Sequence, residues 1–153
     1  MTAYLTAPLR IAAGRVARTD DTAQSISDFL SLLISTACGS MGADPDFGFV
    51  FNNLRFEIFD EREGVVYDST SAVHDRNNPD DLYSKKVSGT SRNLNTFAQE
   101  LKKAVDRYEH RLSDVSVSMV YTRETRTIAV TVEGTVAGME KKYVYHNNIR
   151  IWN

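Results

Sequence analysis

The chain has 153 residues, of which 42% are hydrophobic and 25% charged, proportions typical of a single globular domain with its own core. A formal net charge of −2 gives no general attraction to nucleic acid, so no nucleic-acid partner is expected. The longest apolar run, FLSLLISTAC, is too short for a membrane helix, and the first residues lack the pattern of a signal peptide. We therefore expect a cytoplasmic protein that does not insert into a membrane.

The first predicted element is a short edge strand after Pro8. A helix over about residues 22–38 follows, because Asp21 and Gln24 fit a capping box at its start. Gly39 can adopt the left-handed conformation that ends a helix. The apolar face of this helix has residues spaced three and four apart, namely Ile26, Phe29, Leu30, Leu33 and Ile34.

The middle of the chain is predicted to be an insert. In LRFEIFDEREGVVY, apolar and polar residues alternate on either side of an acidic turn that ends at Gly64, which indicates a β-hairpin. Residues 69–93 are polar and rich in turn formers, and a loop of this length is unusual in a compact domain. We interpret residues 59–93 as an inserted hairpin and flexible loop within one domain that spans residues 1–153.

A second helix is predicted over about residues 96–111. Thr96 and Gln99 offer a capping box at its start. Its apolar stripe consists of Leu94, Phe97, Leu101, Ala104, Val105 and Tyr108.

After this helix the apolar period changes from 3.6 to 2, which indicates strands. Alternating residues over 115–121 and 128–132 predict two strands joined by the turn TRETR. The segment KKYVYHNNIRIWN predicts one further strand, or two short strands joined at Asn147 and Asn148. This order of elements predicts an α+β domain, with two helices packed on one face of a mixed, mainly antiparallel sheet.

The side chains that carry chemistry do not form a recognised catalytic or metal-binding pattern. His74, His110 and His146 lack ligand spacing, so no metal site is expected. Cys38 lies in an apolar helical stretch, which favours a buried thiol. An acid pair for sugar hydrolysis would have to come from acidic turns, which are generally solvated: Asp44, Asp46, Asp60, Glu61 and Glu63. We therefore expect neither catalysis nor a cofactor.

The triplet Glu109-His110-Arg111 lies where the second helix should end. Adjacent residues of a helix point in different directions, so these three cannot form a triad by themselves. Arg111 complements the negative end of the helix dipole, whereas Glu109 does not. Glu109 therefore needs a positive partner, either a buried arginine of the fold or a basic group of another protein.

Three short motifs, in this order along the chain, resemble those of a known family. They are a T-x-x-G helix end, a P-x-F-G segment, and a long helix that closes on Y-E-P-R-[LI]. The matching residues here are Thr36 and Gly39; Pro45, Phe47 and Gly48; and Tyr108, Glu109, Arg111 and Leu112. The ordered set, over about residues 5–58 and 94–136, resembles the TssE and phage baseplate wedge family, the sheath initiators of contractile injection systems. The chain departs from the family pattern in Ser40 and Met41, where Glu-Arg is common, and in His110, where the motif has proline.

The resemblance implies a structural baseplate protein rather than an enzyme, with no cofactor and no small-molecule substrate. In the family the Glu-Pro-Arg motif engages the wedge proteins of the baseplate. We accordingly expect Glu109 and Arg111 to lie near the surface. The expected wedge-docking residues are Tyr108, Glu109, His110, Arg111 and Leu112.

The family's sheet also starts sheath assembly by pairing with a strand of the sheath protein. The candidate residues for this pairing are Tyr143, Tyr145, Ile149, Ile151 and Trp152, unless these side chains only complete the core. Two other functions stay open: a regulatory binding module, as in a bacterial anti-adaptor with the same fold, and a lysozyme-like hydrolase. The Y-E-x-R motif favours the injection-system function.

Overall fold

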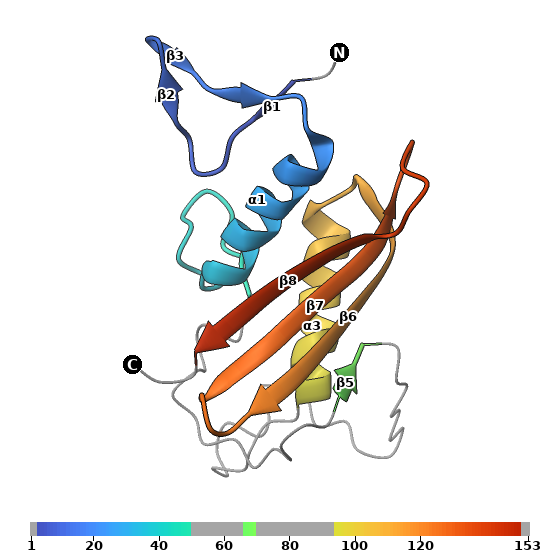
Figure 1. The fold of residues 1–153 in the computed structure, drawn as a ribbon. Helices are drawn as coiled ribbons and strands as arrows, with labels where there is room; N and C mark the ends of the chain where they lie inside the picture. The colour runs from blue at the N-terminus through green and yellow to red at the C-terminus, as the bar shows by residue number, and fades with distance from the viewer. Residues whose placement is uncertain (1–2, 50–65, 70–93, 151–153) are drawn as a thin grey trace.

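The computed structural model of this protein describes residues 3–49, 66–69 and 94–150 (Figure 1). Most of the predicted insert at residues 59–93 lies outside these ranges, as does the first strand of the predicted hairpin. The described residues form two helices and antiparallel sheets, which confirms the predicted α+β class. Their buried apolar side chains belong to one core.

Helix α1, Thr22–Ser35, begins where the capping pattern predicts. The Oδ1 atom of Asp21 accepts a hydrogen bond of 3.0 Å from the backbone N–H of Gln24, which satisfies a free N–H group of the first turn. The reciprocal half of the capping box is not formed, because the Gln24 side chain donates to Asp28 at 2.7 Å instead. The cap is therefore a single hydrogen bond.

Helix α1 ends three residues earlier than predicted. Thr36 already has an extended backbone, and both its N–H and its hydroxyl donate to the carbonyl of Leu32. Gly39 does have a positive φ of 80°, but it lies in the loop beyond the helix. Thr36 therefore ends α1.

Helix α3, Leu94–Tyr108, starts two residues before its predicted start and ends three residues before its predicted end. Thr96 lies inside its first turn, so the predicted cap is wrong. The predicted apolar stripe is confirmed. Its fully buried members are Leu94, Phe97, Leu101 and Val105, and its partly buried members are Ala104 and Tyr108.

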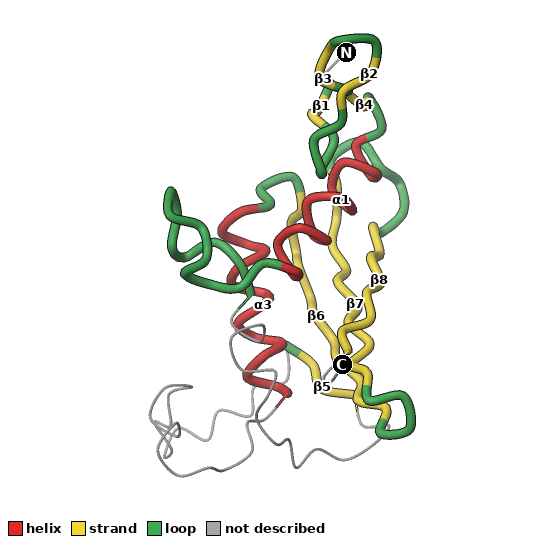
Figure 2. Tube along the Cα trace, turned by 90° about the vertical axis from the view of Figure 1, so that its left-hand side faces the viewer, coloured by secondary structure: helices red, strands yellow, loops and turns green. Residues whose placement is uncertain are grey.

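The main sheet has the order β5-β6-β7-β8, and every neighbouring pair is antiparallel. The TRETR turn joins β6 to β7 as predicted, and β8 continues without a break through Asn147 and Asn148. Figures 1 and 2 show both helices on the same face of this sheet. The strands are β5 (Val66–Asp68), β6 (Leu112–Thr122), β7 (Thr127–Val136) and β8 (Tyr143–Arg150).

A β-bulge lies at the start of β6. The pairing register with β7 shifts between Ser113 and Ser116, and Asp114 within the shift has a φ of 51°, a region that aspartate tolerates better than most residues. Leu112 before the bulge and Val115 after it are both buried, although they are three residues apart. The bulge thus turns both side chains toward the helices.

The chain before α1 forms a separate ribbon, which we call the N-terminal arm (residues 3–20). Strands β1 (Tyr4–Leu5) and β4 (Arg18–Thr19) pair at its base, and β2 (Ile11–Ala12) and β3 (Arg15–Val16) pair at its tip. The predicted edge strand after Pro8 is present only as the two residues of β2, and it belongs to the arm rather than to the main sheet. The arm projects beyond the N-terminal end of α1 (Figure 2).

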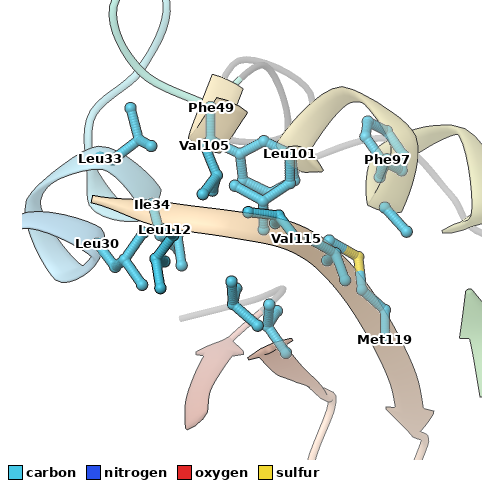
Figure 3. Packing of buried hydrophobic residues seen from close by; sticks show 14 of the residues in the cluster. Leu30, Leu33, Ile34, Phe49, Phe97, Leu101, Val105, Leu112, Val115 and Met119 are labelled. Atoms are coloured by element: carbon cyan, nitrogen blue, oxygen red, sulfur yellow. The ribbon is translucent and has the colours of Figure 1, made fainter. Parts of the chain in front are cut away.

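The core fills the space between the helices and the sheet. Figure 3 shows Leu30 and Ile34 of α1, Leu101 and Val105 of α3, and Val115 of β6 gathered in this space. Full burial of one such side chain stabilises the fold by about 1.5–3 kcal/mol. This packing fixes the turn between α3 and β6 relative to α1.

Candidate functional site

The turn between α3 and β6 contains the predicted docking motif. The N–H of Glu109 donates to the carbonyl of Val105 at 2.8 Å, and the N–H of Leu112 donates to the carbonyl of Glu109 at 3.2 Å. The Glu109 side chain is only 3% exposed, whereas that of Arg111 is 27% exposed. A carboxylate buried to this degree is stable only if it is paired and hydrogen-bonded.

Arg111 supplies the pairing. Its Nε and Nη2 atoms donate to Oε1 and Oε2 of Glu109 at 2.7 and 2.5 Å, and its backbone N–H donates to Oε1 at 3.1 Å. Such a two-bond contact uses the planar fork of arginine, which lysine lacks. The hydrogen bonds that Arg111 donates to Glu109 raise the pKa of Arg111 above its ordinary value, while burial acts in the opposite direction. We call this contact the Glu109–Arg111 pair.

Arg111 also joins the turn to two other parts of the fold. Its Nη1 donates to Oγ of Ser25 at 2.9 Å, and Ser25 is a buried residue in the first turn of α1. The guanidinium carbon lies 4.8 Å from the centroid of the Tyr4 ring, a cation–π contact. One side chain thus holds together the turn, α1 and the N-terminal arm.

The expectation that Glu109 and Arg111 both lie near the surface is wrong for Glu109. Its positive partner is the partly buried Arg111, an arginine of the fold rather than a basic group of another protein. His110 is exposed, Tyr108 and Arg111 are partly buried, and Leu112 is buried. The atoms of this motif that another protein can reach belong mainly to His110 and to the outer side of Arg111.

Tyr108 connects this motif to the loop that follows α1. Its ring packs edge-to-face on Phe47 with centroids 5.2 Å apart, and Phe47 packs in the same way on Phe29 at 6.0 Å. Arg107 lies over the Tyr108 ring at 5.3 Å and forms an ion pair with Asp46 at 3.0 Å. Burial, and then the nearby carboxylate of Asp44, raise the pKa of Tyr108.

The loop itself is closed by backbone hydrogen bonds at motif residues. The N–H of Gly39 donates to the carbonyl of Pro45 at 2.7 Å, and the N–H of Phe49 donates to that of Thr36 at 2.8 Å. Gly48 has a φ of 123°, and a Cβ atom there would lie 2.6 Å from the Thr36 carbonyl oxygen. The T-x-x-G and P-x-F-G segments therefore close one loop, and only glycine fits at its narrowest point.

Strand β8 pairs only with β7 among the described strands, so it is an edge strand there. Tyr143 is buried, and its hydroxyl lies 2.7 Å from Oγ of Ser27 in α1. Tyr145 and Ile149 pack partly buried against the core. These side chains do help to complete the core, while the backbone of the strand forms the sheet edge. Ile151 and Trp152 lie outside the described residues.

The remaining candidates are dispersed. His110 and His146 are exposed on different elements, and no group of three His, Cys, Asp or Glu side chains within the described ranges could hold a metal ion. Burial, and then the carboxylates of Asp46 and Glu100, raise the pKa of Cys38, which lowers its thiolate fraction. His74, Asp60, Glu61 and Glu63 lie outside the described residues.

Sequence reasoning missed Ser25 and Tyr4, which complete the surroundings of Arg111. Ser25 lies beside Ile26 on the buried side of α1, and a polar residue at a core position indicates a buried hydrogen bond. No comparable signal identifies Tyr4, because the arm has no regular pattern.

No helix within residues 3–49, 66–69 and 94–150 is long and apolar enough to cross a membrane. No family model matches the sequence. A comparison with curated proteins also finds no match.

Proposed function

We propose that this protein is a structural component of the baseplate of a contractile injection system, where it docks on the wedge complex and initiates sheath assembly by strand pairing. The observation that carries the proposal is the meeting of three motif segments in space. Tyr108 of the Y-E-x-R segment packs on Phe47 of the P-x-F-G segment, and that segment closes a loop with Thr36 of the T-x-x-G segment. Because the three segments that resemble one family also pack against one another, a common structural role for them is supported.

The docking surface in this proposal differs from the one that the motif alone suggests. Glu109 is buried and engaged with Arg111, so it positions the arginine instead of contacting a partner. The wedge protein contacts exposed His110 and the outer side of Arg111. The contact is therefore polar and centred on one turn of the chain.

The strand-pairing role is supported by the position of β8. An edge strand presents N–H and C=O groups that have no partner on one side, and a strand of another protein can satisfy them. The described residues of β8, Tyr143–Arg150, are all paired with β7 on their other side, so the strand is already extended and held in register. A sheath strand would bind there without first ordering the edge.

A seeding experiment tests the proposal. The purified chain is added, with the wedge proteins of the same system, to its sheath protein, and the delay before sheath polymerisation is measured. Lysine on an edge strand opposes further pairing. Val144 is exposed on β8, so Val144→Lys should lengthen the delay severalfold while wedge capture persists.

Thr135→Lys is the matched control, because Thr135 is also exposed but lies on β7, which has strands on both sides. This variant should seed like the wild type. Wild-type-like seeding by Val144→Lys would contradict the strand-pairing role. Failure of the wild-type chain to capture the wedge complex would contradict the proposed function as a whole.

A further inference from the structure

The edge strand β8 presents different chemistry on its two sides. Alternate side chains lie toward the helices, where Tyr143 is buried and Tyr145 and Ile149 are partly buried against the core. The side chains between them point away from the helices and are all exposed, namely Val144, His146, Asn148 and Arg150. A strand added to this edge (Figure 1) would continue both faces of the sheet, so its own side chains must suit both.

On the helix side the edge is mainly apolar. Ile149 lies opposite Ile128 of β7, and Tyr145 lies opposite Val132. The two β7 side chains are buried, whereas those of Ile149 and Tyr145 keep part of their surface uncovered. Asn147 between them donates a hydrogen bond of 3.0 Å to the Tyr145 hydroxyl. Apolar side chains on an added strand would bury the remaining apolar surface of this side.

On the other side the edge is positively charged where β8 reaches Arg150. Arg150 is exposed and lies opposite Thr127 of β7, and Arg126, which precedes Thr127, is also exposed. Neither arginine forms an ion pair within the described residues. The turn before β7 holds one carboxylate, Glu124, together with Arg123 and Arg126. This end of the sheet therefore carries an excess of positive charge.

We propose that the strand which pairs with β8 is acidic on the face away from the helices, with a carboxylate opposite Arg150, and apolar on the helix side. The inference rests on the strand-pairing role proposed above and specifies the chemistry of the partner strand. Opposite charges on directly facing residues of neighbouring strands stabilise the pair. Val144, at the other end of β8, lies opposite Glu133 of β7, so the requirement for a carboxylate is confined to the end with Arg150.

A second copy of this chain is a poorer partner for the edge. Residues 141–153 contain Lys141, Lys142 and Arg150 but no aspartate or glutamate, so two β8 strands would bring positive charges together. Like charges on facing strands are destabilising. Basic residues on an edge strand also limit pairing with arbitrary strands. An acidic strand is the partner for which the same charges become attractive.

Titration of the purified full chain with three synthetic peptides, followed by amide chemical shifts, tests the proposal. Each peptide has about eight residues, an ordinary strand length, and alternates valine with glutamate, glutamine or lysine. The glutamate peptide should bind about tenfold more tightly than the lysine peptide, with the glutamine peptide between them. The largest shift changes should fall on the backbone amides of β8. Added salt should reduce the preference.

Charge reversal locates the origin of the preference. Arg150→Glu should abolish the preference for the glutamate peptide, and Arg126→Glu should reduce it. Arg15→Glu is the matched control, because it makes the same change in net charge at an exposed arginine of the arm tip, and it should retain the preference. Unchanged melting temperatures would show that the three variants are folded.

Equal affinities for the glutamate and lysine peptides overturn the inference, as does a preference that persists in Arg150→Glu. Binding of the glutamate peptide without shift changes in β8 overturns it as well, since the attraction would then act elsewhere. The outcome is separable from that of the seeding experiment. If Val144→Lys delays sheath seeding but the peptides show no preference for charge, the strand-pairing role stands and only the inference about the partner's chemistry fails.

Discussion

The turn at residues 108–112 and the N-terminal arm differ in how their arginines are used. In the turn, Arg111 is engaged by Glu109 and Ser25 within the fold. In the arm, Arg10, Arg15 and Arg18 are exposed beside exposed apolar side chains. The region that resembles a docking motif is thus largely occupied by internal contacts, whereas the region without a recognisable pattern has an uncovered surface. The residues of a sequence motif can serve to hold parts of the fold together, and other surfaces of the protein are then candidates for binding.

Removal of Arg111 should have the largest effect on stability. Arg111→Ala leaves the buried Glu109 carboxylate unpaired, at a cost of about 3–5 kcal/mol, which corresponds to a fall in melting temperature of roughly 6–20 °C for a domain of this size. Calorimetry of the isolated chain measures this fall in melting temperature. Lys102→Ala is the control, because the Lys102–Asp106 pair is partly exposed and should contribute less than about 1 kcal/mol.

The double variant Arg111→Ala with Glu109→Gln sharpens this result. It removes the buried charge together with its partner, so it should recover part of the lost stability. If Arg111→Ala lowered the melting temperature no more than Lys102→Ala, the Glu109–Arg111 pair would not be a structural contact.

The loop that packs on Tyr108 should be the next most sensitive part. Gly48→Ala would place a Cβ atom 2.6 Å from the Thr36 carbonyl oxygen at a φ of 123°. Strain and steric overlap should together cost about 2–4 kcal/mol. Gly42→Ala, where no atom lies within 4 Å of an added Cβ, should change stability by less than about 0.5 kcal/mol. Equal denaturant midpoints for the two variants would show that the loop relaxes without cost.

Loss of the contact between the N-terminal arm and the turn at residues 108–112 should have the smallest effect on stability. Tyr4→Ala removes the ring that lies over Arg111, and an exposed cation–π contact contributes about 0.5–1 kcal/mol. Amide hydrogen exchange should accelerate in residues 3–20 and stay unchanged in α3. Tyr4→Phe retains the ring and should accelerate exchange less than Tyr4→Ala does. Faster exchange throughout the chain after Tyr4→Ala would mean that the arm is part of the main cooperative unit.

The elements whose patterns extend over many residues could be predicted from sequence. The apolar stripe of α3 and the alternation in β6 and β7 each repeat several times, so the helix and strand assignments are correct. The ends of the helices were less predictable, because Thr36 terminates α1 before Gly39 through its own hydroxyl. The strands of the arm have two residues each, too few for any period to appear.

The burial of Glu109 could not be predicted from its neighbours. Its stabilisation depends on the orientation of Arg111, and that side chain is fixed by Ser25, 86 residues away in the sequence. Local reasoning identified that Glu109 needs a positive partner. The three-dimensional packing of α1 against the turn decided that this partner lies within the chain.

The bulge in β6 has a consequence for how this sequence tolerates length changes. In an ordinary strand successive side chains point to opposite faces, so residues three apart should lie on opposite faces. Leu112 and Val115 both face the core because the bulge inserts one additional residue between them. Loss of Asp114 would remove this additional residue, and strict alternation would then direct Leu112 and Val115 to the same face without a bulge. The alternation of side-chain direction before the bulge is thus shifted by one residue relative to the alternation after it. A one-residue deletion between Leu112 and Val115 is therefore tolerated in side-chain direction, whereas a one-residue deletion within residues 116–122 would reverse the faces of the side chains on one side of it.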